Sequence, residues 1–228
     1  MAFQAKENVI RSVTLLYFSV IGLYSIFVFF EYNPLKEVFG FIRIPILMLL
    51  YYYASLKRDY LYFLALLLFQ IAYLSFSQSS ESSYFWGAVT SVVFRFVLIV
   101  IVCRVLKDMR WTTIFLTSLP ILFVFLYLID LIKESITNSY YLWVINGFLT
   151  AFLGGLSVSN YCYKDDKKSF WLLISALLFV VQIGLFFVNK FYLKQQLFVH
   201  MIILLYGVSH YTFFKFMVFK DEESVEQG

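Results

Sequence analysis

The chain of 228 residues contains 62% hydrophobic and only 14% charged residues, whereas soluble domains are about 45–50% apolar and about 25% charged. This composition excludes a soluble globular domain, and 28 Phe and 18 Tyr against 9 Gly and 3 Pro exclude a disordered or collagenous chain. The formal net charge of +4 is small and gives no support for binding to nucleic acid. We therefore predict an integral membrane protein.

Hydrophobic stretches long enough to cross a bilayer follow one another along almost the whole chain. A hydrocarbon core of about 30 Å needs about 20 apolar residues per helix, and continuous rather than alternating apolar runs favour helices over barrel strands. The sequence predicts an all-α bundle of eight transmembrane helices with short loops, formed as a single domain over residues 1–228. The predicted spans are 10–31, 38–56, 60–76, 84–105, 111–132, 139–162, 169–193 and 196–219.

The distribution of Lys and Arg predicts the orientation of these helices. The side that carries the N-terminus, the C-terminus and the loops after the second, fourth and sixth stretches has 12 Lys and Arg residues, and the other side has 5. Because cytoplasmic loops carry an excess of these residues, we expect both termini to lie in the cytoplasm. The expected location is the cell (cytoplasmic) membrane.

Charged groups inside the apolar stretches are few, and a charge near the bilayer centre costs about 2.5–3.5 kcal/mol on insertion scales. Arg95 lies close to the middle of stretch 84–105, and Arg43 lies two residues before Pro45. Asp130 and Lys190 lie near the ends of their stretches. The uncharged polar residues inside the stretches are Gln70, Thr90, Ser91, Asn146, Thr150, Gln182, Asn189, His200, Tyr206 and His210.

Helical spacing predicts that some of these polar residues face a common interior. Tyr206 and His210 are four residues apart and therefore share a helix face. We expect a polar-lined cavity between stretches 38–56, 84–105, 169–193 and 196–219, in which Arg95 meets carbonyls, amides, water or a ligand anion. The alternative is that the polar groups only join helices by hydrogen bonds. The candidate ligand-binding residues are Arg43, Arg95, Gln182, Lys190, Tyr206 and His210.

Motifs of soluble enzymes are missing from the sequence. It has no GxSxG, HExxH or Walker A motif, and two histidines without adjacent acids make a poor metal site. We predict no metal and no cofactor. The pair Gly154-Gly155 in stretch 139–162 predicts a close approach between helices.

Several segments resemble the lysoplasmalogenase (YhhN-type) membrane family. Residues 42–52 (IRIPILMLLYY) resemble its second span, in which Lys-Pro opens a leucine-rich helix, and Arg95 stands eight residues after Gly87, where the family typically has a histidine. Residues 175–182 (SALLFVVQ) and 206–210 (YGVSH) resemble segments of its last two spans. The resemblance covers residues 38–216 and implies hydrolysis of the vinyl ether of a lysophospholipid in an intramembrane cavity.

The chain departs from that family at the acidic residues to which the resemblance assigns the chemistry. Gln182 stands at the acidic position of the seventh span, and Phe69 to Tyr73 in the third span contain no carboxylate. Vinyl-ether hydrolysis needs an acid to protonate the alkene and a base to activate water, and an amide cannot act as that acid. The departures therefore argue against the hydrolase activity, whereas a cavity for the lipid is still expected.

Three functions are left open by the sequence. The first is a divergent lysoplasmalogenase-like protein that binds or processes a lysophospholipid, with membrane lipid as an expected partner. The second is a non-catalytic membrane sensor, scaffold or complex subunit, for which the sequence indicates no particular protein partner. The third is a transporter of a small solute or lipid, although the sequence offers no convincing internal repeat.

Overall fold

Eight long α helices and no strand make up the part of the chain that the computed structural model describes, residues 2–30, 33–78, 80–106 and 108–226. Side chains in these ranges are described except at residues 2, 3, 5, 33, 137 and 223–226. The helices are α1 (Ala2–Phe29), α2 (Asn33–Ala54), α3 (Tyr60–Ser77), α4 (Glu81–Val105), α5 (Trp111–Leu131), α6 (Tyr140–Tyr163), α7 (Lys167–Phe187) and α8 (Gln196–Glu226). Two 3-10 turns (Lys133–Ser135 and Thr137–Ser139) precede α6, and a π-helical turn (Val188–Tyr192) follows α7.

The predicted helical fold is confirmed, since each of the eight helices is long and apolar enough to cross a membrane. Helices α4 and α7 begin before their predicted apolar stretches, because side-chain caps rather than hydropathy set their first turns. The Ser80 side chain accepts a hydrogen bond from the Ser83 backbone N–H and starts α4 at Glu81. Asp166 caps α7 through the Ser169 N–H in the same way. At its C-terminal end, α8 continues seven residues beyond the predicted boundary at 219.

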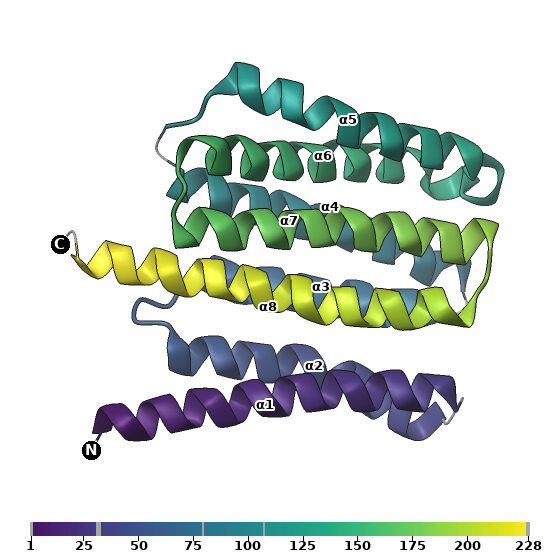
Figure 1. Cartoon of the computed structure of the whole chain (residues 1–228). Coiled ribbons are helices and arrows are strands. Elements are labelled where there is room, and N and C mark those ends of the chain that lie inside the picture. Colours follow the sequence, from purple (N-terminus) through teal and green to yellow (C-terminus); the bar gives the residue numbers. More distant parts are fainter. Residues whose placement is uncertain (1, 31–32, 79, 107, 227–228) are drawn as a thin grey trace.

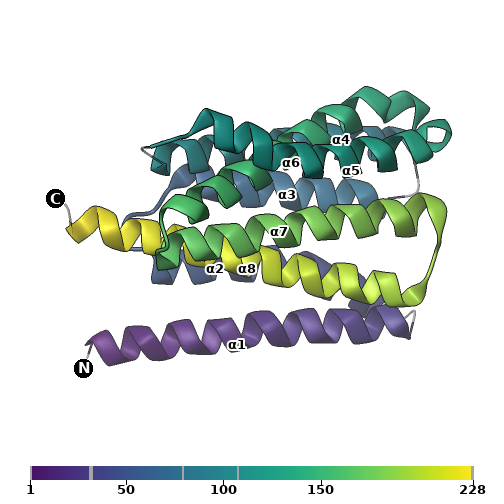
Figure 2. The ribbon, with the colours of Figure 1, turned by 45° about the horizontal axis from the view of Figure 1, so that its top comes forward.

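The helices run roughly side by side and alternate in direction (Figure 1). Neighbours in sequence pack most extensively, as α1 with α2, α3 with α4, α5 with α6 and α7 with α8. The α1–α2 pair forms one edge of the bundle and the α5–α6 pair the other, with α3, α4, α7 and α8 between them (Figures 1 and 2).

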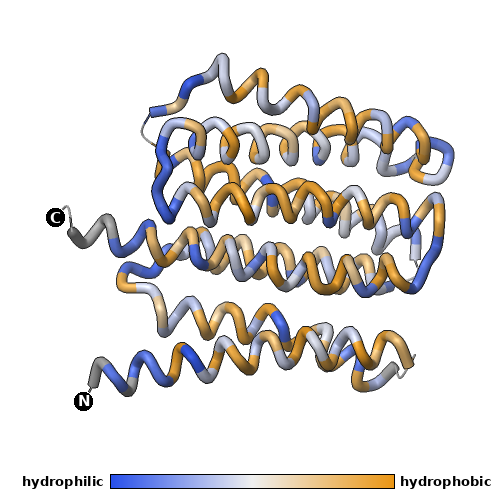
Figure 3. The backbone as a smooth tube through the Cα atoms, in the orientation of Figure 1, coloured by the Kyte–Doolittle hydropathy of each residue, from blue (hydrophilic) through white to orange (hydrophobic). Residues whose placement is uncertain are grey.

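The two ends of the bundle differ in the loops that they carry. We call the end where α1 begins and α8 ends the terminal end; it also carries the loops at 55–59, 106–110 and 164–166. The opposite end carries the connections at 78–80, 132–139 and 193–195. Hydrophilic residues gather at the two ends and hydrophobic residues cover the middle (Figure 3).

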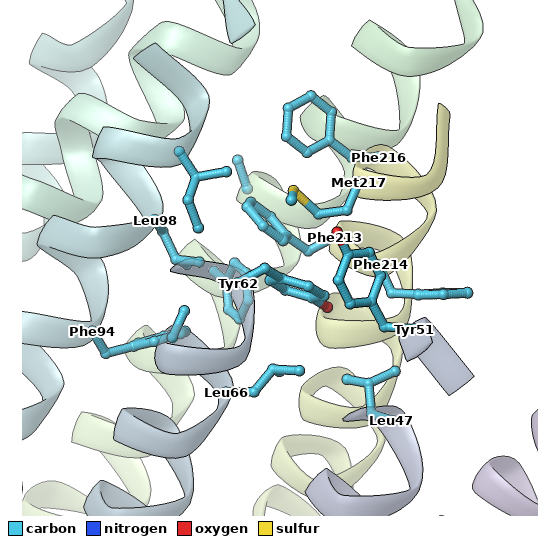
Figure 4. Packing of buried hydrophobic residues seen from close by; sticks show 14 of the residues in the cluster. Leu47, Tyr51, Tyr62, Leu66, Phe94, Leu98, Phe213, Phe214, Phe216 and Met217 are labelled. Carbon is cyan, nitrogen blue, oxygen red and sulfur yellow. The ribbon is translucent and has the colours of Figure 1, made fainter. Parts of the chain in front are cut away.

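The main hydrophobic core has members on all eight helices, and Figure 4 labels its part between α2, α3, α4 and α8. Tyr51 of α2 and Tyr62 of α3 meet edge to face with 4.7 Å between their ring centroids, and Tyr62 continues to Phe213 of α8 at 5.6 Å. Such ring pairs contribute about 0.5–1.5 kcal/mol each beyond their burial. Bulky rings therefore pack α2, α3 and α8 against one another.

A glycine of α6 allows this helix to approach α5 closely. A Cβ added at Gly155 would lie 2.7 Å from the backbone oxygen of Ile114. We expect Gly155→Ala to lower the free energy of unfolding by about 1–3 kcal/mol, because the helices must separate to admit the methyl group. Gly22→Ala is the matched control, since no atom lies within 4 Å of that position and alanine favours the helix by up to about 1 kcal/mol. Thermal unfolding in detergent compares the two, and equal effects would contradict the tight α5–α6 contact.

Candidate functional site

A partly enclosed cavity of about 160 Å³ lies between the α3–α4 and α7–α8 pairs, in the half of the bundle nearer the opposite end. Most of its wall is aromatic or aliphatic, with a small number of polar groups, which is the usual make-up of a ligand pocket. The lining residues on α3 and α4 are Phe69, Ala72, Tyr73, Phe76, Ser91 and Arg95. Those on α6, α7 and α8 are Trp143, Gln182, Ile183, Phe186, Ile202 and Tyr206.

Arg95 supplies the cation of this cavity. Its side chain is 8% exposed, and its Nη1 donates hydrogen bonds to the Ser91 Oγ at 2.6 Å and to the Ser91 backbone oxygen at 3.2 Å. Ser91 Oγ also accepts a hydrogen bond from Asn146 Nδ2 of α6 at 3.0 Å. Among the residues that the structure describes, no carboxylate pairs with Arg95. The guanidinium thus keeps donors and a full charge for a ligand.

Tyr206 also lines the cavity and carries a buried hydroxyl. This side chain is 6% exposed, and its hydroxyl has no hydrogen-bond partner among the described residues. A buried hydroxyl without a partner costs about 1–3 kcal/mol, so a ligand acceptor at this position would remove the cost. Gln182, on the facing helix α7, makes only a long contact of 3.5 Å, in which its Oε1 accepts from Ser209 Oγ.

Arg43 lies behind the cavity wall rather than in it. Its side chain is 2% exposed and its Nε donates to the Gly40 backbone oxygen at 3.0 Å. The guanidinium carbon lies 4.3 Å from the ring centroid of Tyr24, 4.8 Å from that of Tyr73 and 4.4 Å from that of Tyr206. Because Tyr73 and Tyr206 line the cavity, these three cation–π contacts fix two of its wall residues.

His210 also packs behind Tyr206. The centroid distance between the two rings is 4.9 Å, and the His210 ring lies 4.2 Å from that of Phe69 and 5.0 Å from that of Phe179. Its Nε2 has no hydrogen-bond partner in the described chain. The predicted shared face of Tyr206 and His210 is confirmed, but only Tyr206 reaches the cavity.

Lys190 lies apart from the other predicted site residues. It belongs to the π-helical turn at Val188–Tyr192, is exposed, and its nearest ring contact is with Tyr84, at 6.0 Å from Nζ to the centroid. Lys190 does not line the cavity. Of the six predicted residues, the structure brings Arg95, Gln182 and Tyr206 into one cavity.

Aromatic residues near the opposite end complete the cavity and were missed by sequence reasoning. The rings of Phe76, Trp143 and Phe186 lie 5.7–5.9 Å from one another. Gly87 leaves room for this cluster, since a Cβ there would lie 2.8 Å from the Phe76 ring. The wall therefore includes α3 and α6, whereas α2, which we expected to contribute, supplies no lining residue.

The carboxylates that could have supplied acid–base chemistry do not reach the cavity in the described part of the chain. Asp130 is exposed at the end of α5 and pairs with Lys133, with 3.1 Å between Oδ1 and Nζ. Glu31, at the end of the predicted stretch 10–31, is the other acid that we expected could approach Arg95, and it lies outside the described residues. No group of three or more His, Cys, Asp or Glu side chains in the described ranges could hold a metal ion. The arrangement can bind an anion, and its lining has no carboxylate for proton transfer.

Comparison of the chain with known protein families, with characterised proteins and with solved structures finds no match. The resemblance to the lysoplasmalogenase family therefore stays a prediction.

Proposed function

We propose that this chain is an integral membrane protein that binds a single-chain lipid with an anionic headgroup, of the lysophospholipid type, in the cavity beside Arg95. The observation that carries the proposal is a buried arginine that lines a cavity and has no carboxylate partner in the described chain. A cation in a low-dielectric site binds phosphate oxygens through short, charge-assisted hydrogen bonds.

The size and lining of the cavity support a lipid headgroup as the occupant. Its volume of about 160 Å³ is below the roughly 300–1,000 Å³ of pockets that enclose a whole drug-sized ligand. A headgroup can enter beside Arg95 and Tyr206 while the acyl chain leaves through the open side of the cavity. A lipid with one chain needs less space between the helices than a lipid with two.

The proposal assumes insertion of all eight helices, with both termini in the cytoplasm. The excess of Lys and Arg at the terminal end supports this orientation. In this orientation the cavity lies in the outer half of the membrane, because its lining residues lie toward the opposite end of the bundle.

Binding is favoured over hydrolysis because of the chemistry of the lining residues. Vinyl-ether hydrolysis needs a proton donor and a base close to the substrate, and none of the described residues that line the cavity is a carboxylate or a histidine. Incubation of the purified protein with a lysoplasmalogen tests this point, and release of a fatty aldehyde would contradict it.

The binding itself is tested with Tyr206→Phe. We expect this change to weaken binding of a lysophospholipid about 5- to 10-fold, the value of one hydrogen bond, and to leave the free energy of unfolding unchanged or slightly higher, because the lost hydroxyl has no partner. Equilibrium titration with lysophosphatidylglycerol, followed by tryptophan fluorescence, measures the first effect, and thermal unfolding without the lipid measures the second.

The matched control is Tyr211→Phe, another tyrosine of α8, which does not line the cavity. It should leave the affinity unchanged. Equal affinities of wild type and Tyr206→Phe would remove this hydroxyl from the ligand site.

A further inference from the structure

A second pocket lies at the terminal end of the bundle, far along the helices from the cavity described above. It has a volume of about 390 Å³, which falls in the range of small-ligand sites. The loop between α2 and α3, the start of α3, the end of α4 and the last part of α8 meet around it. Its charged lining residues are Lys57, Arg58, Asp59, Arg104, Lys220 and Asp221.

Both acids of this pocket are engaged by neighbouring groups. Asp59 accepts the Leu61 backbone N–H at 3.0 Å as the cap of α3, and its Oδ2 lies 2.5 Å from Lys220 Nζ. Asp221 is 1% exposed and accepts hydrogen bonds from the hydroxyls of Tyr51 and Ser55. These contacts leave the carboxylates little capacity to neutralise further cations.

The other three cations of the pocket have no such partner among the residues that the structure describes. In the described ranges, no carboxylate lies within ion-pair distance of Lys57, Arg58 or Arg104. The Arg58 guanidinium is held over the Tyr52 ring, with 3.7 Å between its Cζ and the centroid. All three side chains are exposed, and the strongly exposed Tyr60 beside them is a typical residue of the membrane–water interface.

We propose that this pocket binds the phosphate of an anionic phospholipid headgroup from the leaflet around the terminal end, through Lys57, Arg58 and Arg104. Basic pockets between transmembrane helices on the cytoplasmic side bind anionic headgroups by charge attraction. Arg58 and Arg104 can each donate two parallel hydrogen bonds to phosphate oxygens. The proposal rests on the membrane insertion proposed above and is independent of the ligand in the cavity beside Arg95.

The test uses the full chain in phosphatidylcholine nanodiscs with increasing fractions of phosphatidylglycerol, and follows the melting temperature. We expect phosphatidylglycerol to raise the melting temperature of the wild type. In the variant K57Q/R58Q/R104Q the affinity should fall on the order of 100-fold, since each cation contributes about fivefold, so the rise should disappear. The Lys220–Asp59 pair and the α3 cap remain in this variant.

The matched control K6Q/R11Q/K167Q removes three exposed cations from the same end of the bundle but outside the pocket. It should keep the full response to phosphatidylglycerol. An equal loss in this control, or a full response in the pocket variant, would overturn the proposal.

Two further experiments address misfolding of the triple variant and the source of the phosphate. If the triple variant does not fold, Lys57→Gln and Arg104→Gln singly should each weaken the response about fivefold, and an unchanged response in both would overturn the proposal. Inorganic phosphate at equal concentration should give no rise. Saturation by inorganic phosphate, with no added effect of phosphatidylglycerol, would assign the pocket to a soluble phosphate and overturn the lipid assignment.

Discussion

Replacement of Arg95 by leucine is expected to weaken lipid binding strongly without destabilising the fold. A charge-assisted hydrogen bond is worth about 1.5–3 kcal/mol, so loss of the guanidinium should weaken binding of a lysophospholipid about 10- to 100-fold. Its hydrogen bonds within the protein are to Ser91 of the same helix, so no helix pair depends on them. Removing the buried charge should leave the free energy of unfolding unchanged or raise it by up to about 3 kcal/mol.

Titration with lysophosphatidylglycerol and unfolding in detergent measure the two effects of Arg95→Leu. Lys190→Leu is the matched control, because Lys190 is exposed and does not line the cavity, and it should bind the lipid as the wild type does. A strong loss of stability in Arg95→Leu with unchanged affinity would make this arginine a structural residue.

Replacement of Arg43, unlike that of Arg95, is expected to destabilise the fold. Its guanidinium lies among Tyr24, Tyr73 and Tyr206, which come from three different helices. A desolvated cation–π contact is worth about 2 kcal/mol, so Arg43→Gln should lower the free energy of unfolding by about 3 kcal/mol or more. Arg43→Lys should also destabilise the protein, because an ammonium cannot stack as a planar group or keep the Nε bond to Gly40.

The control for Arg43 is Arg58→Gln, which removes one exposed arginine from the single ring of Tyr52. We expect a cost of about 0.5–1 kcal/mol or less. Unfolding with a graded denaturing detergent compares the variants. Similar small costs at both positions would show that the three rings do not act as a cage around Arg43.

The helices could be predicted from sequence because the bilayer restricts the backbone so strongly. Continuous apolar runs of sufficient length must be helical to satisfy their backbone groups, and the structure has a helix at every predicted stretch. The helix ends were less accurate, because Ser80 and Asp166 start helices in segments that hydropathy assigns to loops. Bilayer insertion and the orientation of the termini stay predictions.

The candidate site was predicted only in part, for reasons that depend on packing between helices. Arg95 could be identified alone, since a charge in the middle of an apolar stretch is unusual. The position of Arg43 depends on tyrosines from three other helices, and no spacing in the sequence reveals that they converge. Lys190 was included as a cation near the end of its apolar stretch, but it lies in the π-helical turn after α7 and does not line the cavity. Nothing in the sequence marks Trp143 as a cavity residue among the many other aromatic residues of the chain.

The most direct measurement is the contact between the Arg95 guanidinium and the lipid phosphate. Solid-state NMR of the protein with ¹⁵N-labelled arginine in bilayers that contain lysophosphatidylglycerol detects nitrogen–phosphorus pairs at hydrogen-bonding distance. Subtraction of the Arg95→Leu spectrum isolates the signal of this one side chain. We predict a nitrogen–phosphorus correlation that is present in the wild type and absent from the variant. Identical spectra for the two proteins, with every correlation arising from arginines at the ends of the bundle, would contradict a headgroup site inside the membrane.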